Sequence, residues 1–299
     1  ELPLRQEPEE IICEPKAYLN ELMMDDNSGQ PSAKEVFDTT PYTILVVDDN
    51  PDMTDFLKRT FEGYFKRIII AGDGVEALQL VRSHVPDIIV SDVMMPRMNG
   101  YKLCKTIKED INISHIPVIL LTARDDRQSQ ISGYKNGADG YLSKPFEVEM
   151  LMELIRNRLK NREYTKKRYL NAGLIPTPEE STISLTDETF LIKLNSIIQE
   201  NIENSNLGIQ FICQEVGLGR SSLYNKLKAL TGMGANEYIS KLRIEKAITL
   251  ISGTDMPFSE IAEKTGFTTP SYFSTAFKQY TGETPSQYKE RKKKGLADK

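Results

Sequence analysis

The chain has 299 residues, of which 39% are hydrophobic and 27% are charged, a composition typical of soluble globular proteins. This length favours two domains of roughly 100 to 200 residues each, and no apolar run approaches the roughly 18 residues that a membrane-spanning helix needs. The three cysteines lie far apart in sequence and give no disulfide or metal-binding spacing, so we expect a reducing, cytoplasmic setting.

The formal net charge of -5 is unevenly distributed along the chain. In residues 1–40, ten acidic residues stand against three basic ones, whereas residues 187–299 carry fifteen basic and thirteen acidic residues. The acidic total therefore does not argue against nucleic-acid binding by the C-terminal part.

The first 40 residues are acidic and contain four prolines, so we expect a linker or the tail of an upstream domain. From residue 41 to 162, short β-branched runs alternate with segments of helical periodicity, which predicts a doubly wound α/β domain with a five-stranded parallel sheet. The predicted strands cover 43–47, 67–71, 87–91, 116–121 and 140–143. The predicted helices cover 52–65, 74–84, 100–110, 124–137 and 147–164. Residues 163–186 are expected to be a connector.

Residues 187–299 lose the strand pattern and contain an internal repeat, in which 212–232 aligns with 261–282. Each copy has a small residue on a first helix, a glycine at the turn and two apolar residues on a second helix. This pattern predicts an all-α domain with two helix-turn-helix units. A long helix over 236–252 would separate the two second helices by about one turn of DNA.

Polar residues stand where the predicted strands of the α/β domain end: Asp48, Asp49, Asp92, Thr122 and Lys144. Because the carboxyl ends of parallel strands share one edge, we expect these side chains to meet there. Three carboxylates in one crevice need a cation, and Mg²⁺ suits oxygen ligands. Asp92 could then attack a phosphoryl donor in line, with Lys144 and Thr122 binding phosphoryl oxygens.

The motifs "VVDDNP", "DIIVSDVMMPRMNGYKLC", "PVILLTA" and "GADGYLSKPF" resemble the flavodoxin-like receiver domain of response regulators over nearly all of residues 42–160. The resemblance implies that Asp92 is the phosphoacceptor and that the Lys144–Pro145 bond is cis. It also implies a switch pair, Thr122 and Tyr141. The Mg²⁺ ligands that it implies are Asp48, Asp49, Asp92 and the backbone carbonyl of Met94.

An enzymatic alternative is a phosphatase of the haloacid-dehalogenase type, which also uses an aspartyl nucleophile and Mg²⁺. Such enzymes need a second carboxylate two residues after the nucleophile, as general acid. Position 94 is Met, and the residue two positions after Asp48 is Asn50. We therefore expect the reaction to stop at a phosphoaspartate, and we expect no enzyme in this segment.

The stretches "EIAEKTGFTTPSYFSTAFKQYTGETPSQYKER" and "SLYNKLKALTGMGANEYISKLRIEKA" resemble the AraC-type DNA-binding domain over about residues 187–291. In the first copy this implies DNA contacts from Arg220, Ser221, Tyr224, Asn225 and Lys228. In the second copy it implies contacts from Pro270, Ser271, Tyr272, Thr275 and Lys278, with the run Arg291 to Lys294 meeting phosphates. Two features depart from the family pattern. Cys213 stands where alanine is usual, and the second reading helix has no Arg, Lys, Asn or Gln at its outward N-terminal positions.

Together the two resemblances imply a phosphorylation-controlled, DNA-binding response regulator. The partners that we expect are promoter DNA, a histidine kinase and a second copy of the chain after phosphorylation, and we expect no membrane contact by this segment. The opening "ELPL" is similar to the last strand of a kinase ATPase domain, which suggests the cytoplasmic output end of a hybrid sensor kinase anchored in the inner membrane. The alternatives are a stand-alone regulator and a receiver with a protein-binding helical output.

Overall fold

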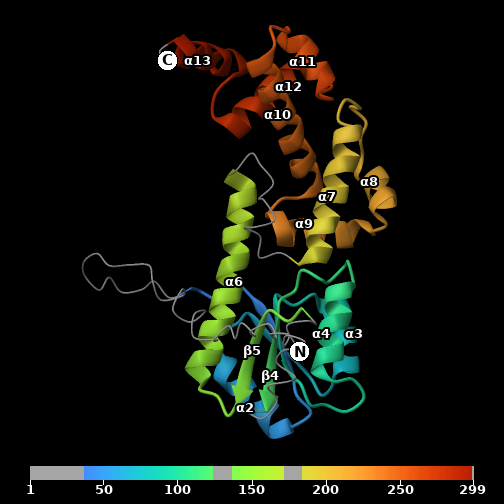
Figure 1. Ribbon diagram of the computed structural model, residues 1–299, viewed down its shortest axis with the longest axis vertical. Coiled ribbons are helices and arrows are strands. Elements are labelled where there is room, and N and C mark those ends of the chain that lie inside the picture. Colours follow the sequence, from blue (N-terminus) through green and yellow to red (C-terminus); the bar gives the residue numbers. More distant parts are fainter. Residues whose placement is uncertain (1–36, 124–136, 172–183, 298–299) are drawn as a thin grey trace, which may run out of the picture. The chain divides into compact units, whose positions relative to one another are not determined.

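The computed structural model describes residues 37–123, 137–171 and 184–297. An α/β region is followed along the chain by an all-α region (Figure 1). The helix expected at 124–137 and the break expected in the connector at 172–182 fall almost wholly outside the described residues, as does most of the acidic N-terminal segment.

The α/β region contains one sheet of five parallel strands in the order β2-β1-β3-β4-β5. This is the predicted fold class. The strands are β1 (Thr43–Val47), β2 (Arg67–Ala71), β3 (Ile88–Asp92), β4 (Val118–Ala123) and β5 (Gly140–Lys144). After β1 the chain first adds β2 on one side of the sheet and then β3, β4 and β5 on the other. The switch point therefore lies between β1 and β3, and ligands bind to such sheets in the crevice at the carboxyl ends of these two strands.

Helices cover both faces of this sheet (Figure 1). The described helices are α2 (Pro51–Phe61), α3 (Gly74–His84), α4 (Gly100–Glu109) and α6 (Val148–Asn171). Alternate residues of β1 face opposite cores, because successive side chains of a strand point to opposite faces. Leu45 packs in the core under α3 and α4, whereas Ile44 packs in the core under α2 and α6.

Local signals explain where the helices begin and end. The side chains of Asn50, Asp73 and Asn99 accept hydrogen bonds from backbone N–H groups in the first turns of α2, α3 and α4, which satisfies donors that lack a helical partner. Helix α2 ends at Phe61 rather than at the predicted residue 65, and Gly63 follows with a left-handed φ of 83°. Helix α6 continues to Asn171, past its predicted end at residue 164 and into the segment that we expected to be a connector.

The all-α region contains seven described helices. They are α7 (Leu185–Glu200), α8 (Ile209–Val216), α9 (Arg220–Thr231), α10 (Ala235–Gly253), α11 (Phe258–Lys264), α12 (Pro270–Thr281) and α13 (Pro285–Ala297). The pairs α8–α9 and α11–α12 are the two predicted helix-turn-helix units. None of the helices in the described ranges is long and apolar enough to cross a membrane.

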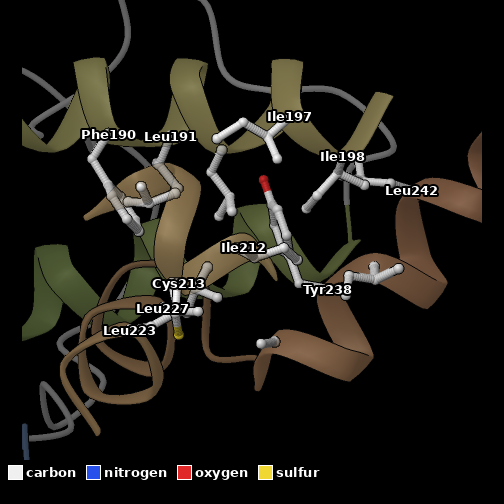
Figure 2. Close-up of a cluster of buried hydrophobic side chains, with 14 of the residues drawn as sticks. Phe190, Leu191, Ile197, Ile198, Ile212, Cys213, Leu223, Leu227, Tyr238 and Leu242 are labelled. Atoms are coloured by element: carbon white, nitrogen blue, oxygen red, sulfur yellow. The ribbon is translucent and has the colours of Figure 1, made fainter. Parts of the chain in front are cut away.

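The first unit shares a core with α7 and the N-terminal half of α10. Figure 2 shows Ile212 of α8 and Leu223 and Leu227 of α9 on the side of the core opposite α7. The ring of Tyr238, from α10, enters this core, and its hydroxyl donates a 2.8 Å hydrogen bond to Oδ1 of Asn195 on α7. A buried hydroxyl needs such a partner.

The second unit packs on the C-terminal half of α10 and on α13 in a separate core, in which Phe273 and Phe277 are fully buried. The helix expected over 236–252 is confirmed as α10 (Ala235–Gly253). Its apolar side chains pack into two different cores. Leu242 belongs to the first core and Ile244 to the second, so the helix is buried on opposite sides along its length.

Candidate functional site

Three of the predicted strand-end residues meet in direct contact. Asp92 ends β3, Asp48 follows β1, and Lys144 ends β5. The Lys144 Nζ lies 2.6 Å from Asp92 Oδ1 and 2.8 Å from Asp48 Oδ2. Both carboxylates are largely buried, with Asp92 7% and Asp48 3% exposed. Residues up to 96 positions apart thus form one cation-bridged pair of carboxylates at the carboxyl edge of the sheet.

Backbone groups fix the orientation of the two carboxylates. The Met94 N–H donates a 2.9 Å hydrogen bond to Asp92 Oδ2, and the Asn50 N–H donates one of 2.9 Å to Asp48 Oδ1. Behind Asp92, Gly100 begins α4 so close to the strand end that an added Cβ would lie 2.3 Å from the Asp92 carbonyl oxygen. Glycine at position 100 therefore lets α4 begin directly against the strand that carries Asp92.

The pKa values of this group reflect burial and pairing. Burial raises the pKa of Asp92 above its ordinary value, and the nearby Asp48 carboxylate adds to the rise, while the hydrogen bond from Lys144 opposes it. Burial alone would lower the pKa of Lys144, but its bonds to Asp48 and Asp92 outweigh this and raise it. Lys144 therefore stays charged, and its ammonium group pairs with both carboxylates.

The other predicted receiver residues lie around this contact without joining it. Asp49 is exposed next to Asp48, and the Met94 side chain is 71% exposed. The buried Thr122 hydroxyl donates a 3.4 Å hydrogen bond to the Ala123 carbonyl, and Tyr141 is half-buried on β5. The Lys144–Pro145 peptide bond is cis, as the resemblance implied.

The donor set suits a hard cation, although a complete metal site is not formed. In the described parts of the chain, no three His, Cys, Asp or Glu side chains lie together closely enough to hold a metal ion. Asp48 and Asp92 already share one cation, the Lys144 ammonium, and oxygen donors of this kind are the ligands that Mg²⁺ prefers. The magnesium site stays a prediction.

The predicted DNA-contacting residues all lie on the surface of the helices that carry them. Arg220, Ser221, Tyr224, Asn225 and Lys228 of α9 are exposed, and so are Pro270, Ser271, Tyr272, Thr275 and Lys278 of α12. The apolar residues between them, such as Leu223 and Phe273, are fully buried. Each second helix thus presents a polar and aromatic face away from its core, which is the arrangement needed to enter a major groove.

Some basic residues of the all-α region pair with acids instead of standing free on the surface. Arg291, expected to meet phosphates, makes a 2.7 Å ion pair with Glu283. Lys226 of α9 is fully buried in an ion pair with Asp187 of α7, and burial lowers its pKa against the opposing effect of Asp187. Sequence reasoning missed Lys226. The sequence signal that could have indicated its burial is its position directly before Leu227, at the edge of the apolar face of α9.

Comparisons with known proteins find two known domain families in the chain. Residues 44–156 match the family model of the response regulator receiver domain, and residues 212–291 match that of a helix-turn-helix domain. The chain is 36% identical to the response regulator MprA of Mycobacterium sp. (strain KMS) over 165 residues, covering 51% of this chain and 70% of that protein. The solved receiver domain of the Francisella response regulator 1452 is 38% identical, with 40% of this chain and 98% of that chain covered and a TM-score of 0.37.

A longer match exists with histidine kinase P4 of Formosa agariphila, at 41% identity over 249 residues. It covers 83% of this chain but only 18% of that protein. The fold and the sites define a receiver joined to a double helix-turn-helix. The chain belongs to the response-regulator family, with a receiver domain and an AraC-type helix-turn-helix domain.

Proposed function

We propose that Asp92 accepts a phosphoryl group from a histidine kinase and that this event controls sequence-specific DNA binding by α9 and α12. The contact of Asp92 with Lys144 and Asp48 is the observation that carries the proposal. It supplies a nucleophile and a fixed positive charge at the edge of the sheet where such folds bind ligands.

In the proposed reaction, a carboxylate oxygen of Asp92 attacks the phosphorus of the donor. The bond from phosphorus to the leaving group breaks, and an acyl phosphate forms on Asp92. Mg²⁺ held by Asp48, Asp49, Asp92 and the Met94 carbonyl would supply positive charge to the phosphoryl oxygens. The Lys144 ammonium then has a new anionic partner in the phosphoryl group, and Thr122 can donate its hydroxyl proton in a hydrogen bond.

The consequence of this step is a change in charge at a site shared by three strands. Phosphorylation replaces the single negative charge of the Asp92 carboxylate with a phosphoryl group that carries about 1.5 to 2 negative charges, at a site where one cation now holds two carboxylates. The receiver state that best accommodates this charge is favoured, with Thr122 and Tyr141 as the proposed switch pair. Dimer formation by phosphorylated chains, which brings two pairs of reading helices together, is the proposed output.

We further propose that the chain acts in the cytoplasm, where promoter DNA and a kinase are both accessible. The match to histidine kinase P4 of Formosa agariphila supports an output segment of a hybrid kinase, because most of this chain aligns with a small part of that much longer protein. The competing proposal is a separate regulator that receives the phosphoryl group from another polypeptide.

Phosphorylation is tested by incubating the chain with Mg²⁺ and acetyl phosphate and following the acid-stable, base-labile label. The wild type should be labelled, and Asp92→Asn should show only background label. Asp55→Asn is the matched control, because this aspartate is exposed on α2, outside the contact with Lys144. Equal labelling of Asp92→Asn and the wild type would show that the phosphoacceptor lies elsewhere.

DNA binding is tested by in vitro selection from random duplexes, with and without phosphorylation. A shared sequence should emerge, and its affinity should fall as the salt concentration rises. Lys228→Met should weaken binding to all sequences alike and reduce the salt slope by about 1, because Lys228 is proposed to meet a phosphate. The absence of any enriched sequence would favour a protein-binding output instead.

A further inference from the structure

The turn glycines of the two helix-turn-helix copies differ in how closely other backbone approaches them. Gly217 and Gly266 occupy equivalent positions and both have left-handed φ angles, of 80° and 71°. An added Cβ at Gly217 would meet nothing within 4 Å, whereas at Gly266 it would lie 2.2 Å from the Ile202 carbonyl oxygen. The second turn is therefore pressed against the backbone that follows α7, and the first turn is open.

Arg243 lies at the same junction. On α10 it stands between Leu242, which belongs to the first core, and Ile244, which belongs to the second. Its Nη2 donates a 2.7 Å hydrogen bond to the Asn204 carbonyl, and its guanidinium lies 6.0 Å from the centroid of the Phe267 ring. Asn204 follows α7 in the first unit, and Phe267 belongs to the turn of the second. One buried side chain therefore contacts both units.

The junction connects directly to the second reading helix. The Phe267 ring makes an edge contact with Tyr272 at 5.7 Å between centroids and lies 5.4 Å from Phe273. Phe273 is fully buried, whereas Tyr272 is one of the proposed DNA-contacting residues. Because packed aromatic rings move together, a shift of the turn at Gly266 would displace the DNA-facing side of α12.

We propose that Arg243 and Gly266 form a joint that fixes α12 relative to α9 and thereby sets the number of base pairs between the two DNA segments that the chain recognises. This inference rests on the proposed DNA binding and adds spacing specificity to it. Each added base pair moves the second segment by about 3.4 Å and rotates it by about 35°. A rigid joint cannot follow such a change, so spacing becomes part of the recognised sequence.

The joint itself is tested without DNA. Nitroxide labels are placed at Lys228→Cys and Lys278→Cys, two exposed and equivalent positions on α9 and α12, after the native cysteines are replaced by alanine. Pulsed electron spin resonance should give a narrow distribution of label distances in the otherwise unchanged chain. Arg243→Met should broaden it, with helical content by circular dichroism unchanged. An equally narrow distribution in a folded Arg243→Met chain would overturn the proposal, whether or not the chain binds DNA.

Spacing specificity is tested on the selected DNA site, using chains with the natural Lys228 and Lys278. One inserted base pair between the two recognised segments should lower the affinity of the wild type about tenfold or more and that of Arg243→Met less than about threefold. Equal losses for both proteins would contradict the proposed role of Arg243.

The two glycines give a matched pair for the same measurement. Gly217→Ala and Gly266→Ala both place a side chain on a left-handed residue, but only the second meets the Ile202 carbonyl. Only Gly266→Ala should relax the spacing requirement and broaden the label distances. Indistinguishable behaviour of the two variants would count against the joint.

Discussion

The two regions of this molecule hold their functional residues in opposite ways. In the receiver, Asp48 and Asp92 are buried and are positioned by the Lys144 cation and by backbone N–H groups. In the helix-turn-helix region, Tyr224 and Tyr272 are 54% and 53% exposed and lie on helices that pack on a buried core. The proposed phosphoryl chemistry thus depends on charges that compensate one another locally, whereas the proposed DNA binding depends on the geometry of a scaffold.

The largest effect is expected at Lys226, a buried and paired charge in the helix-turn-helix region, where the proposed DNA-contacting residues are exposed. Lys226→Met should leave the buried Asp187 carboxylate without its cation and lower the free energy of unfolding by about 3–5 kcal/mol. Urea denaturation measures the effect. Lys228→Met, an exposed position in the same helix, should change stability by no more than about 0.5 kcal/mol. Equal stability of both variants would mean that the buried pair does not support the fold.

A substitution at Gly100 tests whether close packing behind Asp92 is needed for stability and for labelling by acetyl phosphate. Gly100→Ala would place a Cβ 2.3 Å from the Asp92 carbonyl oxygen, so we expect a loss of about 1–3 kcal/mol in unfolding free energy and slower labelling by acetyl phosphate. Thermal unfolding and labelling rates measure the two effects. The control is Gly72→Ala, whose added Cβ meets only the Glu76 carboxylate at 3.6 Å. If Gly100→Ala behaves like this control, α4 can move away from the strand end without consequence.

The smallest expected effect is a pH dependence of the folding stability that comes from His115. Burial, followed by the positive charge of Arg162, lowers the pKa of His115 well below 6.5. The unfolded chain therefore binds a proton below about pH 6.5 that the folded chain does not bind, and stability falls as pH falls through this range, by up to about 1.4 kcal/mol per pH unit.

We expect His115→Gln to flatten this loss between about pH 7 and pH 5.5, as measured by urea denaturation at each pH. The control is His84→Gln, which removes the exposed histidine and leaves His115 in place, so the loss of stability due to His115 should remain. A steep loss that persists in His115→Gln would assign the dependence to other groups.

The sequence was sufficient for the features that follow from periodicity and strand ends. The five strands lie within about a residue or two of their predicted bounds, because β-branched runs in a parallel sheet are apolar on both faces. Asp92 and Lys144 could be placed together because strand ends share an edge. The residues proposed to contact DNA were implied by the family resemblance, and the structure places those of α9 and α12 on exposed surfaces.

What the sequence could not predict is the choice of partners by long, charged side chains. Nothing in the local pattern indicates that Lys226 pairs with Asp187, that Arg97 pairs with Asp73 or that Arg291 pairs with Glu283. These contacts depend on how helices and the segments between them are placed in space, which periodicity does not specify. Periodicity also did not indicate that α10 contributes to two separate cores.

The placement of the cysteines gives each region its own chemical reporter. Cys104 is fully buried in the receiver, where burial raises its pKa to about 12, and Cys213 is 9% exposed in the first helix-turn-helix core. An alkylating reagent reaches the fully buried Cys104 only when the receiver core opens, and it should react faster with Cys213 once the first helix-turn-helix core opens. In a Cys13→Ser chain, mass spectrometry of the two alkylated peptides during a denaturant pulse would therefore record the order in which the receiver and the DNA-binding region come apart.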